Sequence, residues 1–213
     1  HLREPGREDK ECIASGTRAA AAGGFTTICP MANTDPVCDS AQGLQFLISR
    51  VRENGVVNVL PVAALTKGLE GKAIVEFGDL VHYGAVAFSD DGHPVMSAEI
   101  MRRALEYTSM FNMPVLDHCE NEDLTQNGQM RAGACAAKLG LAGIPSASES
   151  SQVARNIDLA RYTGGRVHIM HVSVRASVEH IETAKAQGVN VTAEATPHHL
   201  TLTDDDASAG GSH

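Results

Sequence analysis

The stretch Ala85–Gly92, with the sequence AVAFSDDG, places a serine, two acidic residues and a glycine directly after a short apolar run. A near-continuous apolar run of this length is consistent with a strand that is buried on both faces. Strands of that kind are typical of parallel sheets whose two faces are covered by helices. The stretch therefore predicts an α/β fold in which polar side chains follow the end of a buried strand.

Five more apolar runs have the same character, and helical patterns lie between most of them. The predicted strands are Phe25–Cys29, Val56–Val62, Ala85–Phe88, Pro114–Leu116, Val167–His171 and Val189–Ala193. The predicted helices, each with apolar residues on one face, are Ser40–Glu53, Ser97–Met110, Gln152–Tyr162 and Val174–Ala186. We expect Ser97 to be an N-cap, and Gly164-Gly165 and Gly188 to end the last two helices. This alternation predicts a parallel sheet with right-handed crossovers.

The polar residues at the strand ends distinguish a barrel from a doubly wound sheet. Asp91, His118 and His171 each lie at or just after the C-terminal end of a predicted strand, and His1 precedes the first helix at the same level. Polar residues delivered from many strand ends are characteristic of a TIM barrel. A doubly wound sheet usually has a glycine-rich phosphate loop after a strand, whereas Gly23-Gly24 precedes one.

We therefore predict an α/β fold, a TIM-type (β/α)8 barrel, of which this chain carries about six of the eight strands. The first and last strands are expected to be missing, one before His1 and at least one after Ala193. The predicted domain organisation is a partial barrel over residues 1–203, followed by a polar, glycine-rich tail over residues 204–213 that ends without a helix or strand.

Composition excludes several classes of partner. The 213-residue chain has a net charge of −9, and its 17 Lys and Arg residues are scattered, whereas nucleic-acid binding needs clustered basic residues. The five cysteines are irregularly spaced without a CxxC pair, which argues against a disulfide framework or a zinc ribbon. No apolar run approaches the roughly 18 residues of a membrane span. We expect a soluble, cytoplasmic protein with reduced thiols.

Two histidines and an acidic pair are candidate metal ligands. His118 ends the strand in LDHCE (116–120), and His171 ends the strand in HIMH (168–171). A single histidine at a strand end is more often a hydrogen-bonding residue. Two on neighbouring strands, with Asp90-Asp91 at the end of the strand before them, favour a hydrolytic zinc site, for which imidazole and carboxylate are usual ligands.

The acidic pair itself has two interpretations. Asp90-Asp91 either forms an Asp-Gly turn that closes the strand, or one carboxylate bridges two metal ions while the other holds the loop. The neighbouring histidines favour the second interpretation. His168 lies three residues before His171, so we expect it on the opposite face of the strand, packed under a helix. The roles of His198 and His199 stay open.

Arg3 and Asn33 are candidate substrate contacts. Arg3 is either a surface residue or, two residues after His1, a fork for a substrate carboxylate, because guanidinium binds carboxylate through two hydrogen bonds. Asn33 lies in a loop after a strand end and can contact the same group, although asparagine is also common in turns without any function.

Six stretches together resemble a known family. They are HLREPG (1–6), GGFTTICPMANTDP (23–36), AFSDDGHPVM (87–96), DHCEN (117–121), IMHVS (169–173) and EATPHHLTLTDDD (194–206). The sequence resembles the dihydroorotases of the amidohydrolase superfamily, specifically the bacterial type I group. The resemblance implies a TIM barrel that uses one or two zinc ions to interconvert dihydroorotate and N-carbamoyl-L-aspartate in pyrimidine synthesis.

The resemblance also implies a role for each candidate. His1 matches the second histidine of the family's His-x-His metal motif, Asp91 the catalytic bridging aspartate, and His118 and His171 the ligands of the second metal. Arg3 and Asn33 match contacts to the substrate carboxylate. The family's first histidine and its last metal-binding aspartate, the expected general acid/base, lie outside this chain. We therefore expect this chain to be inactive by itself.

The reaction implied by the resemblance is attack of zinc-activated water on the ring amide carbonyl of dihydroorotate. One alternative is a related cyclic amidohydrolase, an allantoinase or hydantoinase. Those relatives usually have a carboxylated lysine where this chain has Ser89-Asp90-Asp91. A second alternative is a non-catalytic partner of aspartate transcarbamoylase, against which the retained ligands argue. We expect a homo-oligomer, with association with aspartate transcarbamoylase as a further possibility.

Overall fold

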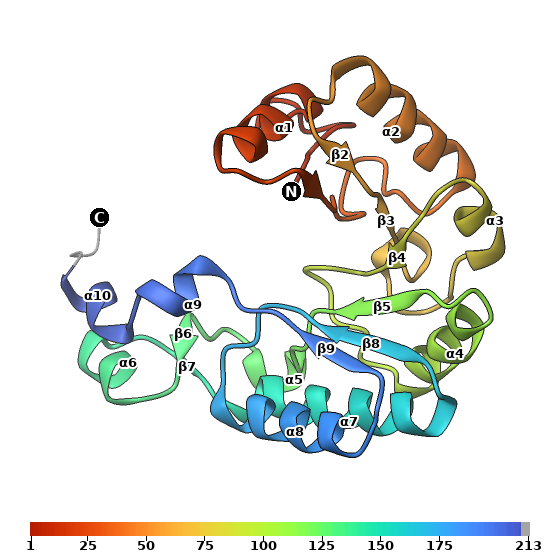
Figure 1. The fold of residues 1–213 in the computed structure, drawn as a ribbon. Coiled ribbons are helices and arrows are strands. Elements are labelled where there is room, and N and C mark those ends of the chain that lie inside the picture. The colour runs from red at the N-terminus through yellow and green to blue at the C-terminus, as the bar shows by residue number, and fades with distance from the viewer. Residues whose placement is uncertain (210–213) are drawn as a thin grey trace.

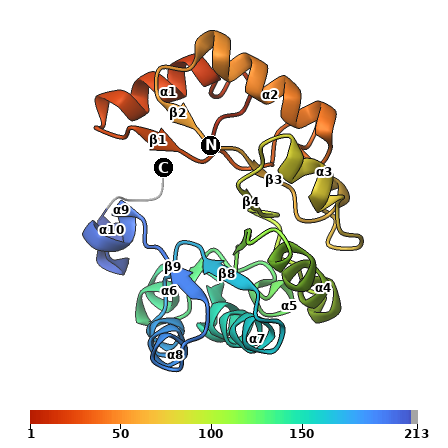
Figure 2. The same cartoon turned by 45° about the vertical axis from the view of Figure 1, so that its right-hand side comes forward.

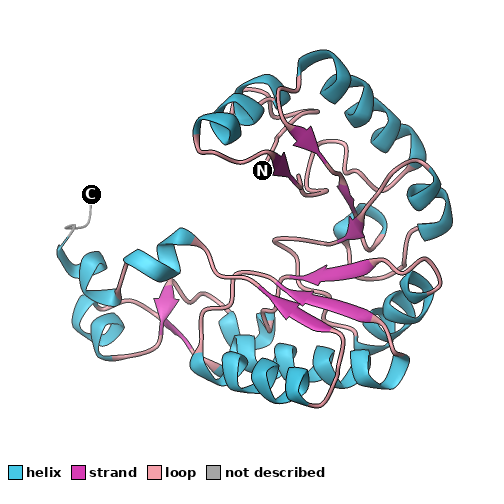
Figure 3. Ribbon diagram, viewed as in Figure 1, coloured by secondary structure: helices cyan, strands magenta, loops and turns pink. Residues whose placement is uncertain are grey.

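The computed structural model describes residues 1–209, which form a curved layer of parallel strands with helices on its outer side (Figure 1). Turning the view shows that the strands follow one another along an open arc (Figure 2). Figure 3 shows the strands on the inner side of this arc and the longer helices on its outer side. Among the described residues, no helix is long and apolar enough to span a membrane.

The regular elements are short strands and longer helices. The strands are β1 (Thr27–Ile28), β2 (Asn58–Val59), β3 (Val62–Ala63), β4 (Ala87–Phe88), β5 (Pro114–Asp117), β6 (Met130–Arg131), β7 (Gly143–Ile144), β8 (Arg166–Ile169) and β9 (Val191–Ala193). The helices are α1 (Ile13–Ala22), α2 (Ala41–Asn54), the 3₁₀-helix η1 (Lys67–Leu69), α3 (Phe77–His82), α4 (Ala98–Ser109), α5 (Glu122–Thr125), α6 (Ala134–Leu139), α7 (Ala147–Thr163), α8 (Arg175–Ala186), α9 (Pro197–Thr201) and α10 (Asp204–Ala209).

Apart from the separate pair β6–β7, the strands within each sheet lie in the order in which they follow in the chain. β1 pairs with β2, and β3-β4-β5-β8-β9 form a second sheet, with every pair parallel. This order never reverses, whereas a doubly wound sheet has a switch point at which it does. The predicted TIM-type arrangement is therefore confirmed over the described part of the chain, and all six predicted runs contain strands.

One predicted strand is interrupted. The run Val56–Val62 contains β2 and the first residue of β3, so the prediction of a single continuous strand is wrong. Pro61 separates the two, because proline has no N–H to donate to a neighbouring strand. Its carbonyl still accepts from Val86 N at 3.0 Å, and Val62 N donates to Pro30 O at 3.1 Å. The two sheets thereby continue into one another.

The predicted helices occur where the periodicity placed them. The Ser97 side chain accepts a hydrogen bond from Ile100 N at 3.3 Å and caps α4, as expected. Gly164 ends α7 with φ 70°, a conformation that glycine adopts without steric cost. α7 begins at Ala147, five residues before the predicted start at Gln152, because its first turns are polar and carry no apolar periodicity.

The core lies between the strands and the outer helices. Phe88 of β4 and Phe77 of α3 are both fully buried, with ring centroids 4.5 Å apart in an edge-to-face arrangement. Tyr107 of α4 continues this contact at 5.3 Å from Phe77. Burial of such large rings stabilises the fold, and it fixes β4 directly before Ser89-Asp90-Asp91.

His168 is not packed under a helix, so that prediction is wrong. Val167 and Ile169 of β8 are buried, and His168 lies between them on the other face of the strand. It contacts Thr192 Oγ1 at 2.8 Å and Glu194 Oε2 at 3.2 Å. Strand alternation cannot be extended to His171, because β8 ends at Ile169 and the backbone of His171 itself has a φ of 35°.

Two regions differ from the sequence-based expectation. Between β5 and α7 the chain forms α5, the parallel pair β6–β7 and α6, which were not predicted because two-residue strands carry no periodicity. The predicted tail 204–213 begins with α10, which the sequence pattern did not indicate, and its end, residues 210–213, lies outside the described part. Asp206 Oδ2 accepts from Thr203 N at 2.7 Å, and acidic residues in the first turn suit the helix dipole.

Candidate metal centre

Three strand ends bring Asp91, His118 and His171 together. Asp91 follows β4, His118 follows β5 and His171 follows β8. Their nearest ligand atoms all lie within 4.8 Å of one another. His118 Nδ1 is 3.0 Å from His171 Nε2, and each of these nitrogens is 3.8 Å from Asp91 Oδ1. The structure thus assembles the three side chains that the sequence pattern selected.

The spacing of these atoms fits a zinc ion. A tetrahedral ion with ligands at about 2.1 Å places its ligand atoms roughly 3.4 Å apart. The three observed separations, 3.0, 3.8 and 3.8 Å, lie around that value. Two imidazole nitrogens and a carboxylate oxygen are also a donor set that zinc accepts in hydrolytic sites. The residues present therefore fit the metal that the fold family implies.

The two acidic residues of the pair have different partners. Asp90 Oδ1 accepts from Leu65 N at 2.8 Å and from Thr66 N at 2.9 Å, and Asp90 Oδ2 accepts from the Thr66 hydroxyl. Burial raises the pKa of Asp90 despite these bonds. Asp90 thus fastens the loop after β3, while Asp91 turns toward the histidines.

The neighbours of Asp91 favour its ionised form. Burial works to raise its pKa, but the interaction with His171 and the nearby charges of His118 and Arg3 outweigh burial, so the pKa lies below its ordinary value. The same interaction with Asp91 raises the pKa of His171, against the opposing effect of burial. A carboxylate that stays ionised in a buried position is suited to hold a cation.

His171 has an unusual backbone conformation. Its φ is 35°, in the left-handed region that residues other than glycine rarely adopt. Ser173 Oγ donates to His171 O at 3.2 Å. Glu149, in the first turn of α7, accepts from Ser173 N at 3.0 Å and from Val174 N at 3.3 Å. These bonds hold the loop that turns the His171 ring toward Asp91, and strained backbone of this kind persists only where the surroundings fix it.

A buried polar network lies beneath His118. Asp117 Oδ2 accepts from Cys119 Sγ at 3.0 Å and from Asn156 Nδ2 at 2.5 Å. Asn156 is fully buried on α7, and its Oδ1 accepts from Arg155 Nε at 3.0 Å. Burial raises the pKa of Asp117 and of the Cys119 thiol. The network fixes the residues on either side of His118 to α7.

The N-terminal loop and the loop after β1 supply the other predicted site residues. His1 Nε2 is 3.3 Å from Asp91 Oδ2, and His1 Nδ1 is 3.2 Å from Asn33 Oδ1. Asn33 Oδ1 also accepts from Arg3 Nη1 at 3.2 Å, and Asn33 Nδ2 donates to Asp91 O at 3.2 Å. His1 therefore lies on the Oδ2 side of Asp91 and the histidine pair on the Oδ1 side, with Asn33 linking Arg3 to Asp91.

This loop packs tightly against the loop of Asn33. Asp35 N donates to Pro5 O at 3.0 Å. Gly6 has φ 94°, and a Cβ at that position would lie 1.9 Å from Asp35 O. Only glycine fits this close approach. The proline-glycine break after Arg3 is thus what allows Arg3 and Asn33 to meet.

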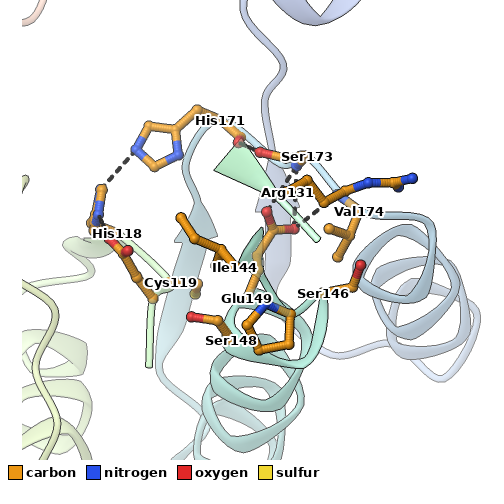
Figure 4. A pocket seen from close by; sticks show the side chains of 12 residues that line it. His118, Cys119, Arg131, Ile144, Ser146, Ser148, Glu149, His171, Ser173 and Val174 are labelled. Atoms are coloured by element: carbon orange, nitrogen blue, oxygen red, sulfur yellow. Dashed lines mark hydrogen bonds and ion pairs between the residues drawn. The ribbon is translucent and has the colours of Figure 1, made fainter. Parts of the chain in front are cut away.

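A cavity of about 290 Å³ opens beside the histidine pair. His118 and His171 lie at one end of it and point toward each other, while Glu149 points toward Ser173 and Val174 (Figure 4). The remaining wall combines the apolar side chains of Ile144, Pro145 and Val174 with polar ones, Arg131 among them. A cavity that joins apolar surface to convergent polar groups is the usual form of a small-molecule site.

Sequence reasoning missed two carboxylates, one that contacts His118 and one that holds the loop after His171. Glu120 Oε2 lies 2.9 Å from His118 Nε2, and Glu149 holds the loop after His171. Glu120 could have been found from the sequence, since it is a carboxylate only two residues after the candidate ligand His118. Glu149 had none, because it lies on a helix between the two histidines in sequence and reaches their loops only through the fold.

Comparisons with known proteins show which family the chain is similar to. A family model described as dihydro-orotase-like matches residues 1–177. The chain is 51% identical over 211 residues to a dihydroorotase from Anaeromyxobacter dehalogenans and 52% identical over 205 residues to one from Syntrophotalea carbinolica. These alignments cover 99% and 96% of this chain but 49% and 48% of the relatives. The chain thus spans about half the length of the curated relatives that it matches.

Solved structures show the same fold at lower identity. An L-hydantoinase (dihydropyrimidinase) from Arthrobacter aurescens matches with a TM-score of 0.79 and 24% identity, over 93% of this chain and 46% of its own. A D-hydantoinase matches with a TM-score of 0.76 and 20% identity, over 98% of this chain and 47% of its own. Likeness at this identity shows a shared fold, while the family follows from the sequence matches. The chain belongs to the dihydro-orotase-like family.

Proposed function

We propose that the whole protein is a zinc-dependent dihydroorotase, which interconverts dihydroorotate and N-carbamoyl-L-aspartate in pyrimidine synthesis. The observation that carries the proposal is the convergence of Asp91, His118 and His171. Arg3 stands beside this cluster, joined to Asp91 through Asn33. A metal-ligand set next to a carboxylate-binding group matches a substrate that has both an amide to hydrolyse and a carboxylate.

The proposed ligand residues lie on two sides of the Asp91 carboxylate. His118 Nδ1 and His171 Nε2 face Asp91 Oδ1, and these three atoms are the proposed donors to one zinc ion. His1 faces Asp91 Oδ2, so the same carboxylate can serve a second ion on the side of His1. Bound zinc would lower the pKa of water toward about 7 and polarise the substrate carbonyl.

Arg3 is the proposed anchor for the substrate carboxylate. Among the described residues, its side chain makes hydrogen bonds only through Nη1, to Asn33. Nε and Nη2 are therefore the two donors that can form a fork with a carboxylate. Binding the carboxylate there would fix the ring relative to the metal centre, which turns binding energy into positioning of the reacting bond.

Arg3→Lys tests the carboxylate assignment. We expect kcat/KM of the whole protein for dihydroorotate to fall by about 10–100-fold, since an ammonium keeps the charge but loses a charge-assisted fork of about 1.5–3 kcal/mol. Steady-state hydrolysis of dihydroorotate measures this. Arg7→Lys, in the same loop but exposed, is the matched control and should be unchanged.

The same assay separates the alternatives. Unchanged kinetics in Arg3→Lys, together with turnover of neutral hydantoins or allantoin, would identify a different cyclic amidohydrolase. Zinc binding without turnover of any cyclic amide would instead indicate a non-catalytic partner of aspartate transcarbamoylase. We also propose a cytoplasmic homo-oligomer, which sedimentation with and without aspartate transcarbamoylase would test.

A further inference from the structure

We infer that Glu120 is a positioning residue that selects Nδ1 of His118 as its metal-facing nitrogen. The inference rests on the proposed metal centre and adds a residue to it. His118 Nε2 lies 2.9 Å from Glu120 Oε2, while His118 Nδ1 faces Asp91 and His171. The ring therefore presents one nitrogen to each side, and only one side holds the cluster.

The chemistry of the pair fixes the position of the proton. An ionised carboxylate only accepts hydrogen bonds, so Nε2 must donate and carries the ring proton. In neutral imidazole the other nitrogen then has a free lone pair, which is the form that a metal binds. Without Glu120 both tautomers are open to the ring, and one of them directs an N–H at Asp91 and the metal position.

The backbone on both sides of Glu120 is anchored, so the carboxylate is held in place. Cys119 is buried and donates to Asp117, as described above. On the other side, Asn121 N donates to Ser148 O at 2.9 Å and to Ser148 Oγ at 3.1 Å, which fastens the loop to the first turn of α7. Glu120 is thereby placed between two fixed residues and reaches back to the His118 ring.

Partial exposure limits the purely electrostatic contribution of this contact. The side chains of His118 and Glu120 are 21% and 33% exposed, so water screens the attraction between their charges. Control of the tautomer does not depend on that attraction, because it requires only a directed acceptor at Nε2. Carboxylates that accept from a metal-ligating histidine typically change metal affinity by about 10–100-fold.

The test is zinc affinity of the metal-free protein, measured by competition with a chelator. We expect Glu120→Ala to weaken zinc binding by about 10–100-fold. Glu120→Gln, which keeps an acceptor oxygen but no charge, should recover part of this loss. Glu122→Ala is the matched control, since Glu122 is an exposed carboxylate two residues further on, and it should bind zinc like the wild type.

A second readout distinguishes positioning from a general loss of structure. Nitrogen-detected NMR of the metal-free protein should show His118 protonated at Nε2 in the wild type and in Glu120→Gln, with a mixture of both tautomers in Glu120→Ala. Equal zinc affinity and the same tautomer in both Glu120 variants would overturn the inference while leaving the metal centre intact. A wild-type protein that binds no zinc would contradict the proposed function and this inference together.

Discussion

Asp91→Ala is expected to lower the proposed dihydroorotase activity of the whole protein by about 10³-fold or more, because metal-based charge stabilisation is worth several kcal/mol and each 1.36 kcal/mol is a factor of ten. Asp91 is 6% exposed and faces both histidine groups, Oδ1 toward His118 and His171 and Oδ2 toward His1. Its loss leaves the imidazoles without the carboxylate that brings them to one centre.

Steady-state kinetics and zinc content by atomic absorption should change together in Asp91→Ala. Asp123→Ala, at an exposed aspartate of α5, serves as the control and should keep both at the level of the wild type. An Asp91→Ala protein that retains zinc and turns over dihydroorotate at the original rate would show that the metal centre lies elsewhere.

Asn156→Ala is expected to lower the free energy of unfolding by about 3 kcal/mol, since a hydrogen bond to a buried charged group contributes about 1.5–3 kcal/mol and the deletion also leaves a cavity. Asn156 is fully buried, and its amide donates to Asp117, which has few other partners to replace it. Denaturant unfolding monitored by circular dichroism measures the loss.

The control for this effect lies on the same helix. Asp158→Ala removes an exposed ion pair with Arg161, and such pairs contribute about 1 kcal/mol or less. A loss in Asn156→Ala no larger than that of Asp158→Ala would mean that the network beneath His118 does not stabilise the fold.

Much of the fold follows from patterns that depend on local sequence. The six apolar runs predicted the strands because a strand buried on both faces must be apolar at nearly every position. The interruption at Pro61 also has a local cause, but the run 56–62 was long enough to be interpreted as one strand. The pair β6–β7 could not be predicted from the sequence, since each strand has only two residues and so shows no periodicity.

The part of the site that could be predicted consists of the residues that directly follow strand ends. Asp91, His118 and His171 were found because parallel strands deliver their C-terminal residues to one edge of the sheet. The wrong prediction for His168 shows the limit of that reasoning. It assumed that strand alternation continues from His168 to His171, whereas β8 ends at Ile169 and a φ of 35° at His171 directs that side chain. The support from Glu149 and Asn156 depends on tertiary packing of α7, which periodicity cannot reveal.

The most direct test of the metal centre is anomalous diffraction at the zinc edge from crystals of the zinc-loaded protein. We predict an anomalous peak about 2.0–2.2 Å from Asp91 Oδ1, His118 Nδ1 and His171 Nε2. A peak bound by other residues, or fully loaded protein with no peak among these three side chains, would contradict the account.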